Sequence, residues 1–470
     1  MCSPGRVSLH LRDDRRGATA GSSGHRAGNL PPPMPILGNG TGLGWLILIV
    51  VALTVGCTTR RTETSRADDH LTYWTSTNPQ EMEFARLIVA EWNRQHPEAP
   101  IDWEPIPAGV SSEEVLLAAI ASRTTPDLCS NIWPGALEQY IEARGLVRLD
   151  DFPDFFSVMR RRMPDEMLAR FRSRDGHYYQ VPWKTNPIMM LYNVRMFREA
   201  GIDHPPRTYA ELLDAGARLT RDRDGDGEID QWLMVIDLQP VWYKRMFDFY
   251  PFYLAASRGQ PLVADDRPVF DNRAAVEVFR LFRELFRRGY VIKSLSYSDP
   301  FLLERVAIKP NVGPWSIAEI ERKRPGQLQY DVAPIPRPDD VPGPSITYGD
   351  YKNIVIFSTS RRPRAAWQFI RFMISKQNDL RLLEMTEQLP IRQPLLADPL
   401  FAGFFRRQPK LIPFARQAFH TRGTDAVPEL KEIFDAIAQE FEACALLGLK
   451  SPERAVHDAA RRSRLILSLR

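Results

Sequence analysis

The 470-residue sequence contains only four cysteines, at Cys2, Cys57, Cys129 and Cys444. Disulfide-dependent scaffolds carry a much higher density of cysteine, and no two of these four have the C-x-x-C spacing of a zinc or redox site. None of the eight histidines falls in an H-E-x-x-H pattern. The sequence therefore excludes a disulfide-stapled scaffold and gives no support for zinc. Cys129 and Cys444 could pair in an oxidising compartment, but two separate buried thiols are the simpler interpretation.

The sequence also has no block of basic residues. Its 62 lysines and arginines are spread among 58 acidic residues, which leaves a formal net charge of +4. Nucleic-acid-binding proteins gather basic and stacking aromatic residues on one surface. We therefore expect no nucleic-acid partner. With 44% hydrophobic residues, a chain of this length can bury a large core and is expected to form two domains or lobes.

The apolar run from Leu43 to Cys57 is too short for a membrane-spanning helix, which needs roughly 20 apolar residues. Its length is that of a signal peptide. The run ends in a small residue followed by Cys57, an ending that resembles the lipobox of bacterial lipoproteins. In that motif a peptidase cuts before the cysteine, and the new amino-terminal cysteine carries the lipid.

We therefore predict that residues 1–57 comprise a signal peptide with a lipobox-like end, in which Cys57 is the lipid attachment site. Thr54 stands where the lipobox prefers leucine, and Met34 is a candidate for the true start. The alternative is an uncleaved membrane anchor. Both interpretations place the rest of the chain on the periplasmic or cell-surface side of the membrane. Residues 58–70 are polar and are predicted to form a flexible tether.

From residue 71 onward, stretches typical of strands alternate with stretches typical of helices. A short apolar strand at Leu71 to Trp74 is followed by an amphipathic helix over about residues 80–95. A second strand, "IDWEPIP", precedes another helix around "SEEVLLAAIAS". This alternation predicts an α/β protein with a parallel, doubly wound sheet and a ligand crevice beyond the carboxyl ends of its strands.

Residues 181–220 carry a strong family resemblance. The segment "VPWKTNPIMMLYNVRMFREAGIDHPPRTYAELLDAGARLT" matches, in order and spacing, the "P…YN…F…AG…PP.T..EL" run of the family 1 extracellular solute-binding proteins. These proteins are the sugar-binding subunits of ABC importers and are related to maltose-binding protein. "NVGPWSIAEI", residues 311–320, resembles the family's ligand-stacking segment, and "SPERAVHDAARR" resembles a late helix. The resemblance covers nearly all of residues 71–465.

The resemblance implies the two-lobed periplasmic-binding-protein fold of type II. Each lobe would be a mainly parallel sheet flanked by helices, and a multi-strand hinge would join them. The expected lobes are residues 71–182 with 335–376 and residues 183–334 with 377–470. The chain is expected to cross between them near residues 178–183, near 332–335 and just after Met373. Closure of the lobes over a ligand would couple binding to a change of conformation.

Sugar sites pair aromatic rings, which cover the apolar C–H faces, with a few polar groups that bind hydroxyls. Trp315, in "GPW", is the principal candidate for stacking because the family resemblance falls directly on it. For each predicted tryptophan, the alternative to ligand binding is packing in the core. For each predicted polar residue, the alternative is a solvated loop position. Asn186 also follows the first expected crossing. The predicted binding residues are Asn78, Trp133, Trp183, Lys184, Trp242, Trp315, Asp350 and Tyr351.

"RDRDGDGEIDQW", residues 221–232, resembles a calcium-binding loop. Asp222, Asp224 and Asp226 alternate along the chain, and Asp230 could supply a further oxygen. Counted from Asp222, however, the twelfth position is Leu233, whereas an EF-hand requires a bidentate glutamate there. A structural calcium site is therefore one hypothesis, and a turn held by aspartate side chains and glycines is the simpler one.

Taken together, these features predict a lipid-anchored, monomeric binding protein that delivers a carbohydrate to an ABC importer. It is expected to have no organic cofactor and no catalytic residues, because no hydrolase motif with a pair of acids and no G-x-S-x-G motif occurs. A secreted glycoside hydrolase and a sensory lipoprotein that feeds a receptor are the alternatives.

Overall fold

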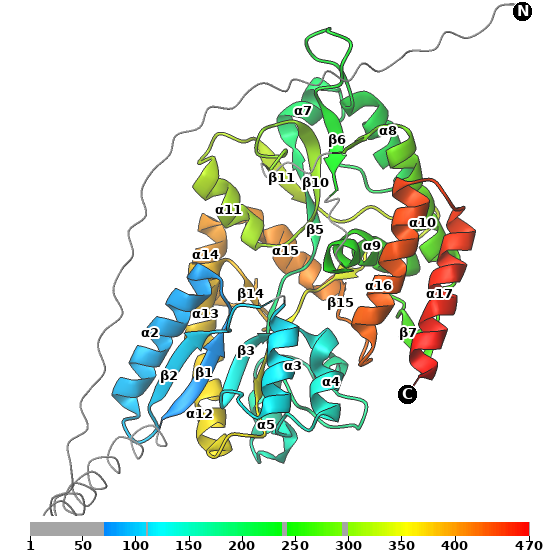
Figure 1. The fold of residues 1–470 in the computed structure, drawn as a ribbon. Coiled ribbons are helices and arrows are strands. Elements are labelled where there is room, and N and C mark those ends of the chain that lie inside the picture. Colours follow the sequence, from blue (N-terminus) through cyan, green and yellow to red (C-terminus); the bar gives the residue numbers. More distant parts are fainter. Residues whose placement is uncertain (1–69, 110, 237–241, 294–298, 470) are drawn as a thin grey trace, which may run out of the picture. The chain divides into compact units, whose positions relative to one another are not determined.

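The computed structural model describes residues 70–109, 111–236, 242–293 and 299–469 (Figure 1). Cys57 and the predicted signal peptide and tether, except His70, lie outside the described residues. Within them, the chain builds two mixed sheets with helices around each. No helix in these ranges combines the length and the apolar character needed to cross a membrane. The predicted α/β class is confirmed.

The first lobe is built on a six-stranded sheet with the order β14-β4-β13-β3-β1-β2. β1 pairs in parallel with β2 and β3, whereas β13 and β14 run antiparallel to their neighbours. The sheet is therefore mixed rather than mainly parallel. Its strands are β1 (Leu71–Thr75), β2 (Ile101–Pro105), β3 (Leu128–Ile132), β4 (Val181–Thr185), β13 (Lys352–Ile356) and β14 (Leu389–Pro390).

Helix α2 (Pro79–Gln95) shows how the sequence specifies this lobe. Asn78 caps its start, Pro79 occupies the first turn, and the apolar positions Phe84, Ile88 and Trp92 recur at helical spacing and are buried. This face packs with strands β1 and β2 (Figure 1). The lobe's other helices are α3 (Ser112–Ser122), α4 (Leu137–Glu142), α5 (Phe155–Arg160), α6 (Asp165–Leu168), α12 (Pro363–Met373) and α13 (Lys376–Thr386).

The second lobe is built on a five-stranded sheet with the order β11-β5-β10-β6-β9. β6 pairs in parallel with β9 and β10, and β5 runs antiparallel to β10 and β11. This sheet is mixed as well. Its strands are β5 (Met189–Asn193), β6 (Trp232–Val235), β9 (Val291–Ile292), β10 (Val306–Val312) and β11 (Tyr330–Ala333).

Helices surround this second sheet, and α16 and α17 pack side by side (Figure 1). The helices are α7 (Val194–Glu199), α8 (Tyr209–Leu219), α9 (Trp242–Ser257), α10 (Arg273–Arg287), α11 (Trp315–Lys323), α14 (Pro399–Arg407), α15 (Ile412–Gln417), α16 (Leu430–Phe441) and α17 (Pro452–Ser468). Two small pairs complete the strands: β7 (Val263–Ala264) with β8 (Arg267–Pro268), and β12 (Thr347–Tyr348) with β15 (Thr421–Arg422).

The chain crosses between the sheets three times, and two crossings fall later than predicted. The first lies at 186–188, between β4 and β5, so Trp183 and Lys184 belong to the first sheet and not to the second lobe. The second lies between β11 and β13, close to the prediction. The third follows β14 instead of Met373. α13 packs on α2 and β14 pairs with β4, so both keep the chain on the first lobe.

Both described cysteines are free and buried. This confirms the interpretation of Cys129 and Cys444 as separate thiols. Burial raises the pKa of the Cys444 thiol to about 11, which keeps it protonated near neutral pH.

Candidate functional site

A cleft of about 650 Å³, which we call the polar cleft, opens at the carboxyl ends of β1 and β2. Open α/β sheets bind their ligands beyond the carboxyl ends of the strands. The first lobe supplies residues that follow β1 and β2 and others close to β3, β4, β13 and β14, and the second lobe supplies Trp315 from the start of α11. The principal side chains are Asn78, Glu81, Asn131, Asn186, Trp315, Asp350, Lys352 and Gln388.

Asn78 lines the cleft and caps the start of helix α2. Its side-chain oxygen accepts hydrogen bonds from the backbone amides of Gln80 (2.9 Å) and Glu81 (3.2 Å). Such a cap satisfies amides that have no partner within the helix. The capped first turn places Glu81 in the wall of the cleft.

Glu81 is buried and forms an ion pair with Lys184, with 2.6 Å between Oε1 and Nζ. Gln388 donates a second hydrogen bond to the same oxygen, at 2.6 Å. Burial by itself raises the pKa of Glu81, but its interactions with Lys184 and the hydrogen bond from Gln388 outweigh burial and lower the pKa below 4.5. The carboxylate is therefore ionised near neutral pH.

Two buried polar atoms in this wall have no hydrogen-bond partner within the described structure. They are Oε2 of Glu81 and Oδ1 of Asn186. A buried acceptor without a partner costs about 1 to 3 kcal/mol, so native proteins rarely retain one without a reason. Both atoms belong to residues that line the cleft, and both are acceptors. Hydroxyl groups of a ligand would satisfy them.

Asp350 and Asn131 adopt left-handed backbone conformations, with φ values of 38° and 66°. Such conformations are costly for residues with a side chain and cluster at ligand sites, where the surrounding structure holds them in place. The carboxylate of Asp350 lies 3.0 Å from Nζ of Lys352, and Tyr348 donates a hydrogen bond to it at 3.3 Å. Asp350 is thereby held in the wall of the cleft.

Trp315 brings a half-buried indole ring to the cleft from the second lobe. The neighbouring Gly313 is required for this position: a Cβ atom at residue 313 would lie 1.9 Å from Cζ3 of the indole. The ring therefore lies closely over the backbone of Gly313. An indole placed in this way is suited to stacking on the apolar face of a sugar.

Of the eight predicted binding residues, the cleft brings together Asn78, Trp315 and Asp350. Trp183 has no exposed surface and packs in the core of the first lobe, so its ring offers no face to a ligand in this structure. Lys184 is equally buried; it contacts Glu81 and lies 4.7 Å from the centroid of the Trp183 ring. Lys184 does not line the cleft, but its ion pair holds the Glu81 carboxylate in the wall of the cleft.

The other three predicted residues lie elsewhere. Trp133 and Trp242 pack against each other with ring centroids 5.3 Å apart, and Trp133 donates a hydrogen bond to the Tyr348 hydroxyl at 2.8 Å. This packing corresponds to the alternative of core tryptophans for these two. Tyr351 lines a different cavity, which is described below.

Four of the principal side chains of the cleft were not identified from the sequence: Glu81, Asn131, Lys352 and Gln388. Glu81 looks like an ordinary acidic residue in the first turn of a helix, and Gln388 precedes a two-residue strand. Their role depends on which strands lie next to each other, and this is a property of the fold. A position just after a predicted strand was the only sequence signal available.

The aspartate loop precedes β6 in the second lobe. Oxygen atoms of Asp222, Asp224 and Asp226 lie within 4.8 Å of one another, and Asp230 is not part of this group. Asp222 accepts hydrogen bonds from the amides of Gly225 (2.6 Å) and Gly227 (2.8 Å), and these bonds lower its pKa. The hydrogen bonds by themselves account for a stable turn. A bound calcium ion stays a hypothesis.

Two mixed sheets, three crossings and a cleft beside the strand ends define the class of two-lobed α/β ligand-binding proteins. The family model for bacterial extracellular solute-binding proteins matches residues 88–403. The chain belongs to this family, and the resemblance stated from the sequence is confirmed.

Comparison with individual proteins agrees with this assignment. The chain is 22% identical to a maltotriose-binding protein of Pyrococcus abyssi over 400 residues, which are 81% of this chain and 78% of that protein. A crystal structure of an uncharacterized protein from Listeria monocytogenes matches with a TM-score of 0.75 at 26% identity, over 85% of this chain and all of that one. The sugar-binding protein of Xanthomonas citri matches with a TM-score of 0.69 at 21% identity, over 85% of this chain and 98% of that one. The last likeness shows the fold.

Proposed function

We propose that this protein captures a carbohydrate in the polar cleft and delivers it to an ABC importer. One observation carries the proposal: a half-buried indole shares the cleft with buried polar atoms that have no partner. Stacking on Trp315 would cover a C–H face of the sugar, and its hydroxyls would donate to Glu81 and Asn186. The similarity to a maltotriose-binding protein favours the same class of ligand.

Closure of the lobes would convert binding into a signal for the importer. Trp315 comes from the second lobe, and nearly all the other polar residues of the cleft come from the first. A ligand that contacts both sides binds the closed arrangement better than the open one and therefore shifts the population toward closure. We expect the importer to recognise that closed arrangement.

A thermal-shift screen of the purified protein against mono- and oligosaccharides tests the proposal. A ligand present at 100 times its Kd stabilises the folded state by about 2.7 kcal/mol, and a melting curve readily detects this. At least one sugar is expected to raise the melting temperature. If no saccharide in a broad panel does so, carbohydrate capture is contradicted.

The variant Trp315→Ala tests whether the sugar binds in the polar cleft. We expect it to abolish the shift caused by the sugar and to leave the melting temperature of the ligand-free protein nearly unchanged, since the ring is only half-buried. The matched control is Trp103→Ala, because Trp103 is a half-buried tryptophan of β2 that does not line the cleft. A sugar response that survives in Trp315→Ala would contradict the site.

The two alternative functions lead to different observations. A glycoside hydrolase would release cleavage products from oligosaccharides, whereas we expect the bound sugar to be recovered intact. A sensory lipoprotein would bind the same sugar but would not need a permease. Uptake of labelled sugar by the source cells should therefore depend on this protein. If deletion of the gene leaves uptake unchanged, the sensory function is favoured.

We also propose that the mature chain is anchored by a lipid on Cys57 and acts as a monomer outside the cytoplasm. The lipobox-like ending of the apolar run supports the anchor. Metabolic labelling with a fatty acid is expected to label the native protein but not the Cys57→Ala variant. If both are labelled equally, or neither is, the anchor is contradicted.

A further inference from the structure

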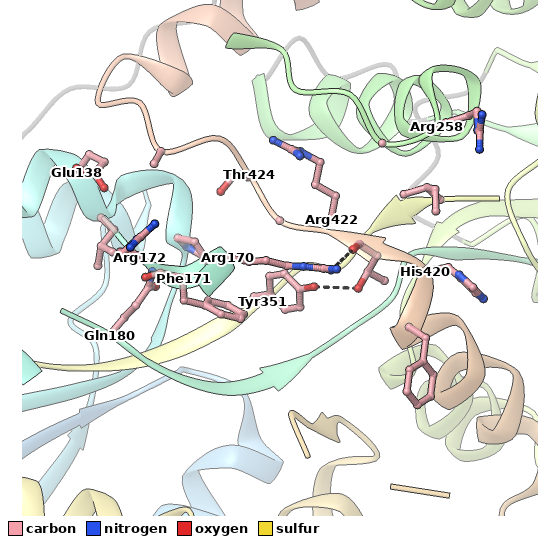
Figure 2. A pocket seen from close by; sticks show the side chains of 18 residues that line it. Glu138, Arg170, Phe171, Arg172, Gln180, Arg258, Tyr351, His420, Arg422 and Thr424 are labelled. Atoms are coloured by element: carbon pink, nitrogen blue, oxygen red, sulfur yellow. Dashed lines mark hydrogen bonds between the residues drawn. The ribbon is translucent and has the colours of Figure 1, made fainter. Parts of the chain in front are cut away.

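A second cavity, of about 430 Å³, is lined by residues of both lobes (Figure 2). We call it the basic cavity. Asp350 lines the polar cleft, whereas the next residue, Tyr351, lines the basic cavity. The two cavities therefore lie on different sides of the segment that leads into β13, and the carbohydrate proposed above does not account for the second one.

Arginine dominates the lining of the basic cavity. Arg170, Arg172, Arg258 and Arg422 line it together with His420, whereas Glu138 is the one acidic residue in the lining. Burial raises the pKa of the Glu138 carboxyl, which weakens the opposing negative charge. A concave site with such an excess of positive charge attracts anions.

Most of this charge is not neutralised within the protein. Arg172 and Arg258 are exposed and have no ion-pair partner among the described residues. Arg170 donates a long hydrogen bond, of 3.4 Å, to the backbone oxygen of Thr421. In Figure 2 the side chains of Arg170, Arg172 and Arg422 lie around the cavity near that of Thr424. Arg422 alone forms an ion pair, with Asp425 at 2.9 Å.

Two polar atoms of the lining residues are buried without a partner. They are Nε of Arg422 and Oγ1 of Thr424, and both can donate a hydrogen bond. Buried donors without a partner are rare because they lose their bonds to water. An oxyanion is a suitable acceptor for either donor, and the guanidinium group is well matched to carboxylate and phosphate oxygens.

Aromatic rings form another part of the wall. Phe171 and Tyr351 contact each other with ring centroids 5.1 Å apart, and the Tyr351 hydroxyl is hydrogen-bonded to Oγ1 of Thr421 at 2.9 Å. Phe419 lines the cavity with 52% of its surface exposed. An organic body carried by the anion would cover these rings. The volume is within the range of small-molecule sites.

We propose that the basic cavity is a second ligand site, which binds a small organic oxyanion, either a carboxylate or a phosphate monoester. Glu138, Arg170 and Arg172 belong to the first lobe, and Arg258, Arg422 and Thr424 to the second. The anion therefore bridges the lobes and changes the affinity of the polar cleft for its sugar. This coupling rests on the function proposed above, whereas the binding itself does not.

Titration calorimetry on the full chain tests the binding, with inorganic phosphate and succinate as probes at fixed ionic strength. At least one probe is expected to bind, and comparison of the two distinguishes phosphate from carboxylate. The double variant Arg172→Gln/Arg258→Gln should weaken binding at least tenfold. Both positions are exposed, so the fold is expected to persist, and circular dichroism checks this. The control is Arg198→Gln, an exposed arginine of α7 outside the cavity.

Three results would overturn the proposal: no binding of either probe, equal binding by the double variant, or an equal loss in the control. The coupling is tested by measuring the Kd of the sugar with and without the bound probe. A change of at least threefold is expected in the wild-type protein and no change in the double variant. If the probe binds but the Kd of the sugar does not change, the bridging role is wrong. If no sugar binds at all, the carbohydrate function fails while the anion site is still tested by its own titration.

Discussion

At the scale of single residues, the buried pair of Glu81 and Lys184 supports the polar cleft. We predict that Glu81→Gln lowers the free energy of unfolding by about 3 to 5 kcal/mol, because it leaves the Lys184 ammonium buried without its counter-charge. The double variant Glu81→Gln/Lys184→Met should cost less than the sum of the two single changes, since it removes both charges. Urea unfolding curves measure the free energies of unfolding of Glu81→Gln, Lys184→Met and the double variant. Additive costs would contradict the coupling.

The same pair gives stability a defined dependence on pH. Because the folded-state pKa of Glu81 lies below its ordinary value of 4.5, the contribution of the carboxylate is fully present above that pH and is lost as the pH falls further. The difference in unfolding free energy between the wild type and Glu81→Gln is therefore expected to shrink as the pH falls below 4.5. A constant difference over this range would mean that Glu81 does not titrate with folding.

The sequence predicted part of the site at this scale. Trp315, Asn78 and Asp350 were found because a family motif or a strand end marked them, and the structure places all three in the cleft. Trp183 looked equivalent, but its side chain points into the core of the first lobe. Glu81 and Gln388 come together only when α2, β4 and β14 are assembled. Which face of a strand becomes buried depends on its neighbours, and a local pattern does not contain that information.

At the scale of elements, the turn at 222–230 is expected to be stable without a metal. Asp222, Asp224, Asp226 and Asp230 each accept a hydrogen bond from a backbone amide within the turn. We predict that calcium and a chelator leave the melting temperature unchanged, and that Asp222→Ala lowers it slightly to the same extent in both conditions. A calcium-dependent rise in the wild type, lost in Asp222→Ala, would establish the ion site instead.

The elements also show why the lobe boundaries were harder to predict than the fold class. The spacing of apolar residues that is typical of β1, α2 and β2 can be recognised within each segment of the sequence. These elements were therefore expected close to where they occur. The third crossing was expected too early, just after Met373. Helix α13 has no sequence feature that distinguishes packing on the first lobe from packing on the second. Leu382, which packs in the first core, and Leu383, which packs in the second, are adjacent in the sequence.

At the scale of the whole molecule, ion pairs join the two lobes. Nζ of Lys431 on α16 lies 2.6 Å from Oε1 of Glu114 on α3. Exposed pairs contribute at most about 1 kcal/mol, a factor of about five in an equilibrium constant. We predict that Glu114→Gln weakens binding of the sugar by up to about fivefold and leaves the unfolding midpoint of the ligand-free protein nearly unchanged. Calorimetry measures the first effect and thermal melting the second. Tighter binding in the variant would show that this pair favours the ligand-free arrangement.

The position of Trp315 has a practical consequence for spectroscopy. Trp74, Trp92, Trp133, Trp183 and Trp367 are buried, whereas Trp315 is the one described tryptophan that lines the polar cleft. Docking of a saccharide would dehydrate this indole, so a blue shift in its ultraviolet emission would report occupancy of the cleft. The protein thus carries its own optical reporter, and occupancy can be followed in real time without a dye.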